Sequence, residues 1–440
     1  MSTTVAPRID LRLPRFHTAP TSTADLVCLA VVAGCALVLH RDGLLGGPTY
    51  YELDTQLFYY PLAEWVGEQL KSGHFPLWLP GIFSGYPIFA DGELGLAYLP
   101  QVLLLWMLPT PVAMVWLRVL HAFLAGAFMF WFLRTLRLEP VPALGGGLVF
   151  AFGSFLTAQM HHENVVRSAV WLPAVLACFQ LALQAPARPG LLMWIALGAL
   201  CFSQAALGLH VQPVFMLVLA IAGYAAFKAI AGPRHIAPFL TAAAIATGGF
   251  GIAAVQWLPL GEWALVSARR GGVAYEFGSA FAIAPENLPT VLFPFFFRLP
   301  DAQTWWTLWQ QWETELYVGI PTLALIIVAV LFARRRELLY FIALGGLALL
   351  IAMAHYAPLL NLHFLLWSMP GFSLLRAPGR FAYLVVFACA GLAAFGVQAL
   401  LAKRARLLVA SAGALPCVAM LAALLAVLPP WRAWLSADVQ

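Results

Sequence analysis

Two carboxylates, Glu52 and Asp54, stand among aromatic residues in the stretch YELDTQLFYYPLAEW, directly after the first apolar segment of the chain. Only 10% of all residues are charged, so an acid at the edge of such an apolar bundle is partly removed from water. A carboxylate in these surroundings can take a proton from a hydroxyl group. The alternative is an amphipathic helix on the membrane surface, whose acids simply face water.

A second polar group, His161, His162 and Glu163, lies in the motif QMHHENVVRSAVW, within a short turn between two apolar runs. Imidazole and carboxylate bind divalent metals, but adjacent residues on one turn rarely point at the same ion. A metal site, a polar turn that faces a substrate and an ordinary capped loop all stay open, and His210 in another short turn could join the group. No cofactor is firmly implied, and a divalent cation is the one candidate.

Arginines form a third candidate site. Arg376 and Arg380 stand four residues apart in SLLRAPGRFAYL, just before a long apolar run. A guanidinium fork suits a lipid-linked phosphate or diphosphate, whereas the alternative is unspecific contact with headgroup phosphates. Arg269 and Arg270 in SARRGG are a second pair of the same kind, and a solvated loop would explain them equally well.

Glu315 completes the set of candidates, in the stretch QWETELYVGIP at the entrance to an apolar run. Substrate contact and simple capping of the positive end of a helix both fit this position. The sequence contains no GxSxG motif, no phosphate-binding glycine loop and no basic stripe of the nucleic-acid type. The six cysteines all lie in apolar runs without a CxxC pair, which indicates packing roles.

These residues must be positioned by membrane helices. The chain has 440 residues, of which 62% are hydrophobic, and apolar runs recur along its length. We expect an all-α polytopic membrane protein with about eleven transmembrane helices, at 25–40, 112–133, 142–159, 165–184, 190–208, 212–229, 236–258, 316–333, 337–354, 381–401 and 407–428. A twelfth apolar run, 94–108, is short and contains Pro100, so it fits a span, a re-entrant segment or an interfacial segment.

The distribution of Lys and Arg decides between these topologies, because cytoplasmic loops are rich in both residues. If 94–108 does not cross, the short basic connections all fall on one side, whereas a crossing would turn every later basic loop outward. We therefore expect a cytoplasmic N-terminal tail (1–24), a transmembrane domain (25–428) with long external loops, and a short external tail (429–440). The loops are 42–111, 259–315 and 355–380, and the first carries interfacial helices.

Several motifs together resemble the YfhO-like bacterial membrane proteins, a branch of the GT-C-type glycosyltransferases. They are GHFPLWLPGIFSGYPIFAD, AYLP, HHENVVRSAVWLP, VQWLPLGEWALVSAR, APENLPTVLFP, ETELYVGIPTLAL and LLRAPGRF, spread over about residues 50–400. The resemblance implies a GT-C-like fold, a polyprenyl-phosphate-linked sugar as donor and an external-loop acid as the catalytic group. Carried over to this chain, that acid is Asp54, the arginines are Arg376 and Arg380, and the histidine turn is His161 and His162.

The hypothesis that follows is an inverting sugar transfer on the external face, with Asp54 as general base and the arginines on the departing phosphate. Tyr59, Tyr60 and Trp78 could stack on sugar rings. The expected partners are membrane lipid and an envelope glycan, lipid or protein acceptor, with no nucleic acid, and the expected location is the inner cell membrane. The alternatives are a lipid or solute transporter and a non-catalytic scaffold for envelope assembly.

Overall fold

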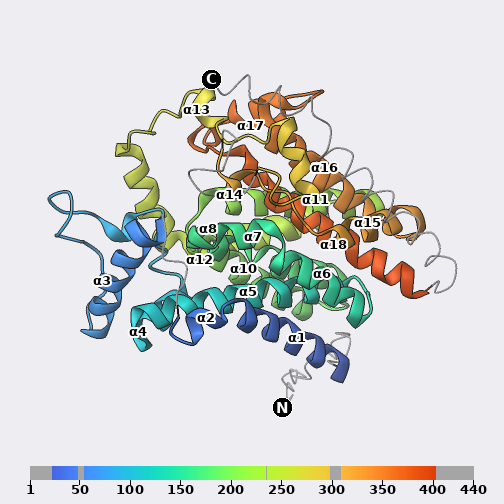
Figure 1. Ribbon diagram of the computed structural model, residues 1–440, viewed down its shortest axis with the longest axis horizontal. Helices are drawn as coiled ribbons and strands as arrows, with labels where there is room; N and C mark the ends of the chain where they lie inside the picture. Colours follow the sequence, from blue (N-terminus) through green and yellow to red (C-terminus); the bar gives the residue numbers. More distant parts are fainter. Residues whose placement is uncertain (1–21, 48–53, 234, 298–308, 403–440) are drawn as a thin grey trace, which may run out of the picture.

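The computed structural model describes residues 22–47, 54–233, 235–297 and 309–402. Within these ranges the chain forms helices and turns and no β-strand (Figure 1). The α-helices are α1 (Thr23–Leu39), α2 (Arg41–Leu44), α3 (Tyr60–Lys71), α4 (Leu99–Met107), α5 (Thr110–Thr135), α6 (Pro140–Phe152), α7 (Ser154–Ala158), α8 (Glu163–Ala169), α9 (Leu172–Gln184), α10 (Arg188–Leu207), α11 (Val211–Ala231), α12 (Ala237–Val266), α13 (Tyr275–Gly278), α14 (Gln311–Thr314), α15 (Ile320–Phe332), α16 (Glu337–Met353), α17 (Leu362–Trp367) and α18 (Ala382–Ala402).

Short helices of other types lie mostly in the connections. One is a π-helix, η1 (Thr55–Tyr59), which leads directly into α3. The others are 3₁₀-helices: η2 (Ile88–Ala90), η3 (Gln159–His161), η4 (Pro285–Val291), η5 (Ala354–Tyr356), η6 (Phe372–Leu374) and η7 (Pro378–Phe381). Because π-helical turns and 3₁₀ turns are frequent at functional sites and helix ends, η1, η3 and η7 mark places where the backbone is adapted to local contacts.

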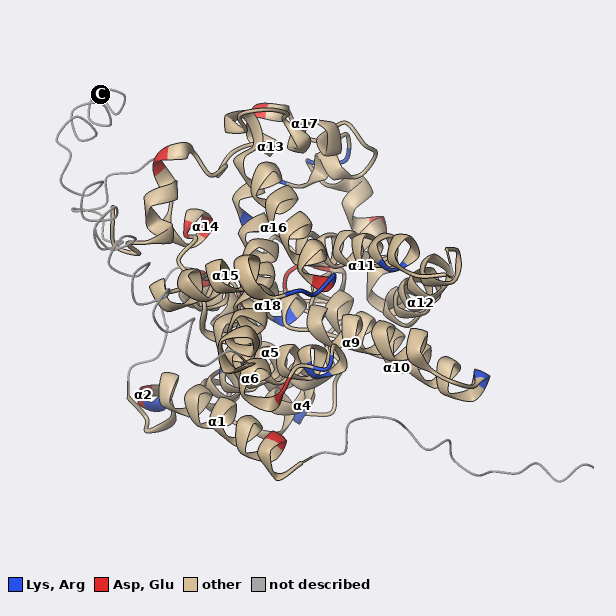
Figure 2. Cartoon of the chain, turned by 90° about the vertical axis from the view of Figure 1, so that its right-hand side faces the viewer, with Lys and Arg blue, Asp and Glu red and all other residues tan. Residues whose placement is uncertain are grey.

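The predicted multi-pass helical architecture is confirmed. Eight helical segments of the described chain are long and apolar enough to cross a membrane: 110–135, 140–161, 163–184, 188–207, 211–231, 237–266, 337–356 and 378–402. Two shorter apolar helices, α1 and α15, lie at two further predicted spans. The predicted span 407–428 and the predicted terminal tails lie outside the described residues, apart from 22–24. Figure 2 shows how few charged residues interrupt these helices.

Helix α4 explains the ambiguous run 94–108. It has nine residues, which at 1.5 Å per residue is about 14 Å, or roughly half of a bilayer's hydrocarbon core. Its main neighbours are α3 and α5. The side chain of Gln101 folds back to donate to the Leu94 carbonyl at 2.6 Å. The segment therefore stays at one end of the bundle.

Contacts between helix ends define a basic end of the molecule. Arg134, in the last turn of α5, pairs with Asp25 at the start of α1, with 2.9 Å between Nε and Oδ1. Arg335, just before α16, donates to the Leu136 carbonyl at 2.9 Å. The start of α1, the end of α5 and the start of α16 are therefore neighbours in space. In Figure 1, α1 (blue) runs beside α5. Helices α15, α16 and α18 (orange to red) lie together on the side of the bundle away from α1.

The segment from α2 to α4 lies at the opposite end. It has an apolar cluster of its own, which includes Leu62, Val66 and Leu105. It is fastened to the bundle by α12, because Gln256 accepts from the Ala97 amide at 2.8 Å and donates to the Phe89 carbonyl at 3.2 Å. This long segment and the turns between the spanning helices form the platform on which the polar residues meet.

Helix packing in the bundle relies on close backbone approach at a few glycines. A side chain at Gly396 of α18 would clash with the Leu325 carbonyl of α15, and one at Gly391 would overlap the ring of Phe341 in α16. Small residues allow such contacts between membrane helices, where dispersion forces and not the hydrophobic effect drive association. Helix α18 therefore lies tightly between α15 and α16, and this fixes the position of the loop that precedes it.

Candidate functional site

Side chains from five chain-distant segments converge at the end of the bundle opposite the basic end. We call this group the polar centre and define it as Asp54, Glu93, His162, His210, Glu313 and Arg380. Asp54 precedes η1, Glu93 precedes α4, His162 follows η3, His210 precedes α11, Glu313 belongs to α14 and Arg380 to η7. The centre therefore draws on all three long loops that were predicted to be external, and on two short turns.

Asp54 forms an ion pair with His162, with 3.2 Å between Oδ2 and Nε2. The Asp54 side chain is 56% exposed and that of His162 is 13% exposed, so the pair has one open partner and one buried partner. The hydrogen bond from His162 lowers the pKa of Asp54 most; partial burial opposes this, and the charges of His162, His161 and Arg380 add to the lowering. Asp54 is therefore an ionised carboxylate that is accessible from outside.

His162 is held from behind by Gln159 of η3. The Gln159 amide nitrogen donates to the Trp312 carbonyl at 2.8 Å, and the Gln159 oxygen lies 2.6 Å from His162 Nδ1. The ring of the neighbouring His161 packs edge-on against Trp312, with ring centroids 4.6 Å apart. Thr55, the residue after Asp54, donates weakly to the His161 carbonyl at 3.4 Å. The histidine turn and the start of the long loop are thus built against each other.

Arg380 forms a forked ion pair with Glu313. Its Nε lies 2.9 Å from Oε2 and its Nη2 lies 2.6 Å from Oε1. The third nitrogen, Nη1, lies 2.9 Å from His210 Nε2, so this histidine accepts the hydrogen bond. The sequence hypothesis placed Arg380 with Arg376 on a substrate phosphate. That contact stays a prediction, and in this structure Arg380 is paired with Glu313.

The backbone before α18 explains why RAPGRF has this composition. A side chain at Gly379 would clash with the carbonyl oxygens of Glu313 and Phe281, and the Gly379 amide donates to Phe281 at 3.0 Å. Ala377 has a left-handed φ of 60°, and its carbonyl accepts from Gln212 at 3.0 Å. Three segments are therefore locked together around the Arg380 guanidinium.

Glu93 is a carboxylate that the sequence analysis missed. Its Oε2 accepts from the Tyr59 hydroxyl at 3.2 Å and from the Asn164 amide, while the Tyr59 hydroxyl lies 2.8 Å from Asn164 Oδ1. Burial and the nearby charge of Asp91 raise the pKa of Glu93. The guanidinium of Arg167 fixes the loop by donating to the carbonyls of Glu93 and Leu94 at 2.7 and 2.9 Å. The acidic stretch FADGEL is the feature of the sequence from which Glu93 could have been recognised.

Tyr59 has a different role from the one expected. Its side chain is only 4% exposed, and its hydroxyl is engaged by Glu93 and Asn164. The ring is therefore not available to stack on a sugar, and Tyr59 supports Glu93 instead. Tyr60 packs at the edge of the same apolar cluster. Trp78 is 56% exposed and lies over Gly85, where a side chain would clash with its indole ring.

A pair of cations lies beside the polar centre. The guanidinium of half-buried Arg376 lies 5.3 Å from the ring of Phe277 and 5.5 Å from the ring of Phe281. Exposed Arg269 lies 5.4 Å from the same Phe277 ring. Burial first, and then the like charges of Arg269 and Arg380, lower the pKa of Arg376. Among the described residues neither Arg269 nor Arg376 has a carboxylate partner, and the same holds for exposed Arg270.

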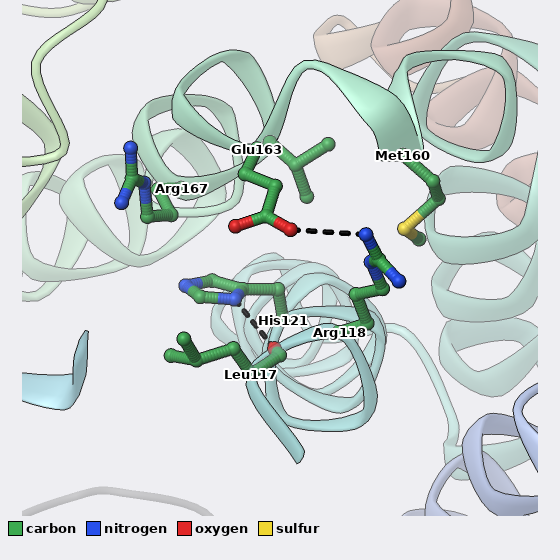
Figure 3. Close-up of a pocket in the computed structure, with 7 residues that line it drawn as sticks. Leu117, Arg118, His121, Met160, Glu163 and Arg167 are labelled. Atoms are coloured by element: carbon green, nitrogen blue, oxygen red, sulfur yellow. Dashed lines mark hydrogen bonds and ion pairs between the residues drawn. The ribbon is translucent and has the colours of Figure 1, made fainter. Parts of the chain in front are cut away.

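Figure 3 shows a small pocket behind the polar centre, lined by Leu117, Arg118, His121, Met160, Glu163, Val166 and Arg167. Glu163 and Arg118 face each other across it, with 3.0 Å between Oε1 and Nη2, and both side chains are buried. His121 lies beneath them, with its Nδ1 2.6 Å from the Leu117 carbonyl. Glu163 was expected to contact substrate. In this structure it forms the internal ion pair with Arg118, and the substrate contact stays a prediction.

The remaining candidates lie apart from these contacts. Glu315 is 4% exposed, and Gln311 donates to its Oε2 at 2.6 Å, while Oε1 has no hydrogen-bond partner among the described residues. Burial raises the pKa of Glu315 to about 7. Glu52 lies outside the described residues. In the part of the chain that the structure describes, no three His, Cys, Asp or Glu side chains are arranged to hold a metal ion.

Comparison of the chain with protein-family models, curated proteins and solved structures finds no match.

Proposed function

We propose that this protein is a membrane glycosyltransferase that moves a sugar from a polyprenyl-phosphate donor to an acceptor hydroxyl at the external face of the membrane. The observation that carries the proposal is Asp54, an exposed and ionised carboxylate that pairs with the imidazole of His162 and feels the positive charge of Arg380. A carboxylate fixed in this way can serve as a general base. The proposal includes a GT-C-like arrangement of eleven spans, related to the YfhO-like proteins, in the inner cell membrane with a cytoplasmic N-terminus.

The chemical step is an inverting displacement at the anomeric carbon. The acceptor oxygen forms the new bond from the face opposite the phosphate, and its proton passes to Asp54. The bond between the anomeric carbon and the phosphate oxygen breaks, and its electron pair stays on polyprenyl phosphate. No metal or redox partner is needed to balance this step. The general base is expected to contribute about 10²- to 10⁴-fold to the rate.

The phosphate is assigned to Arg376 and Arg269 rather than to Arg380. Both side chains lack a carboxylate partner among the described residues, and both lie against Phe277, so they are pre-positioned without being neutralised. Guanidinium groups bind phosphate through paired hydrogen bonds. In the proposed arrangement the phosphate lies at this arginine pair and the sugar extends toward Asp54 and Glu93.

The first test is release of polyprenyl phosphate from a panel of polyprenyl-phosphate sugars, with purified protein in lipid nanodiscs and membrane extract as the source of acceptor. Asp54→Asn is compared with wild type, and Asp42→Asn is the matched control, because Asp42 is an exposed acid of α2 that pairs with Arg41 at the surface. We expect Asp54→Asn to lose turnover while donor binding persists, and Asp42→Asn to match wild type. Equal release by wild type and Asp54→Asn would remove Asp54 from catalysis.

Transport of a lipid or solute is the second candidate. The observation that favours it is the buried ion pair of Arg118 and Glu163 within the spanning helices, because charges inside membrane segments often mark a transport path. Absence of sugar release from every donor, together with flux across liposomes that depends on Glu163, would support transport over sugar transfer.

A further inference from the structure

The contact behind Asp54 fixes which atoms of His162 carry protons. The Trp312 carbonyl can only accept a hydrogen bond, so the Gln159 side chain must direct its amide nitrogen to Trp312 at 2.8 Å. The Gln159 oxygen then faces His162 Nδ1 at 2.6 Å. Because that oxygen can only accept, Nδ1 of His162 is the donor and carries a proton. The contacts of Gln159 therefore require a proton on Nδ1 of His162.

The other ring nitrogen faces Asp54. Nε2 lies 3.2 Å from Oδ2 of a carboxylate that is an acceptor when it is ionised. The contact is attractive only if one proton lies between these two atoms, on either Nε2 or Oδ2. When the pair has lost that proton, a lone pair of nitrogen faces a negative oxygen. The observed closed geometry is therefore that of the pair loaded with one proton.

We propose that His162 is the proton acceptor that works through Asp54 in the transfer step, an inference that rests on the proposed function. In the unloaded pair, Asp54 takes the proton as the acceptor O–H bond breaks. The proton then moves to Nε2 of His162, which restores the ionised carboxylate in the closed ion pair and later releases the proton to water. His162 does not touch the reacting atoms, so it is a positioning residue for Asp54.

The surroundings of His162 suit this role. The charged and titratable groups that face it are Asp54, His161, His210, Arg380 and, through Arg380, Glu313. The ring of His161 is close, with centroids 4.1 Å apart. Burial, followed by the charges of Arg380 and His162, holds the pKa of His210 well below its usual range, so His210 stays neutral. Among these neighbours, Asp54 alone can exchange a proton directly with His162 Nε2.

The test that does not depend on activity is ¹⁵N NMR of histidine-labelled protein in nanodiscs, with His162→Gln used to assign the signals. We expect a pH titration of wild type to pass through a state with protons on both ring nitrogens of His162, and Asp54→Asn at the same pH to show the form protonated at Nδ1 alone. Identical His162 signals in wild type and Asp54→Asn would overturn the inference. This result is independent of whether any sugar is transferred.

The kinetic test compares the pH dependence of kcat in wild type and His162→Gln, which keeps a donor toward Asp54 but cannot accept a proton. We expect kcat to fall about 10²-fold with little change in KM, and the acid limb of the profile to move to lower pH. His74→Gln, a change at an exposed histidine after α3, is the control and should match wild type. An unchanged kcat and pH profile in His162→Gln would contradict the role. If the NMR signals of His162 depend on Asp54 but no sugar is transferred, the proposed function is rejected, whereas the proton shared by His162 and Asp54 is retained.

Discussion

Arg380 donates hydrogen bonds from Nε and Nη2 to the carboxylate of Glu313, at 2.9 and 2.6 Å. Its third nitrogen, Nη1, lies 2.9 Å from Nε2 of His210. This arrangement joins the loop before α18 to the loop before α15 and to the turn before α11. Both members of the ion pair are buried, with side chains 13% and 4% exposed. Removing one member of such a pair leaves an uncompensated charge, and this is more costly than the pair itself is stabilising.

Glu313→Gln is therefore expected to destabilise the protein by about 3–5 kcal/mol, because the Arg380 guanidinium loses its counter-charge in a buried site. Thermal unfolding in detergent, followed by intrinsic fluorescence, measures the effect. Glu337→Gln is the matched control, since its ion pair with Arg335 is partly exposed, and its loss should cost under about 1 kcal/mol. Equal shifts for the two variants would show that Glu313 does not hold the loops together.

Gly379→Ala should destabilise the same region for a steric reason. A methyl group at this position would meet the carbonyl oxygens of Glu313 and Phe281, neither of which can move without disturbing the Arg380 contacts. We expect a cost of about 1–3 kcal/mol, measured as a lower midpoint of unfolding. Gly271→Ala, where the added carbon has open space, is the control and should leave the midpoint unchanged. A wild-type midpoint for Gly379→Ala would contradict the close approach.

Glu315 gives a pH prediction with a definite sign. Burial raises its pKa from 4.5 to about 7, so between these pH values the unfolded chain releases a proton that the folded protein keeps. The effect of Glu315 on the free energy of unfolding is therefore most favourable below pH 4.5. The free energy of unfolding falls by up to about 3 kcal/mol as the pH rises to about 7. Glu315→Gln should remove this slope, and Glu68→Gln, at an exposed acid of α3, should retain it. Unfolding midpoints measured from pH 5 to 8 compare the three proteins.

The arginine pair predicts a binding defect. Arg376→Ala should weaken binding of polyprenyl phosphate by about tenfold or more, because a hydrogen bond to a charged group contributes about 1.5–3 kcal/mol. Arg269→Ala should act in the same direction with a smaller effect, since its side chain is exposed and more fully hydrated. Titration of nanodiscs with polyprenyl phosphate, followed by ³¹P NMR, measures affinity without turnover. Arg270→Ala is the control. If Arg270→Ala weakens binding as much as Arg376→Ala, a general surface charge and not this site binds the phosphate.

The two ends of the bundle predict opposite labelling. Ser72→Cys lies at the exposed end of α3, and Ala187→Cys lies in the exposed turn before α10. A membrane-impermeant maleimide should label Ser72→Cys in intact spheroplasts, and should label Ala187→Cys only after the membrane is opened. Wild type, with its native cysteines, gives the background. The reverse pattern would invert the orientation and place the polar centre on the cytoplasmic side.

The sequence predicted the helices well and the partners poorly. Long apolar runs are local signals, so most of the spans could be inferred from them. Partner choice depends on how helices rotate and on which loops meet, which no local pattern encodes. For that reason the pairing of Arg380 with Glu313 was not predicted, and neither Gln159 nor Glu93 was recognised. Glu93 contacts Asn164, which is 71 positions away, and Gln159 contacts Trp312, which is 153 positions away.

Helix α12 has a consequence for the setting in which the protein works. Its 30 residues extend about 45 Å, which exceeds the roughly 30 Å thickness of a hydrocarbon core. Hydrophobic mismatch of this size must be relieved by tilt or by projection of the last turns beyond the lipid. Gln256, in the second half of α12, holds the backbone on both sides of Glu93, and Arg269 lies shortly after the end of the helix. Bilayer thickness would then act on the height of the polar centre, and under the proposed function lipids of different chain length would tune how the donor meets it.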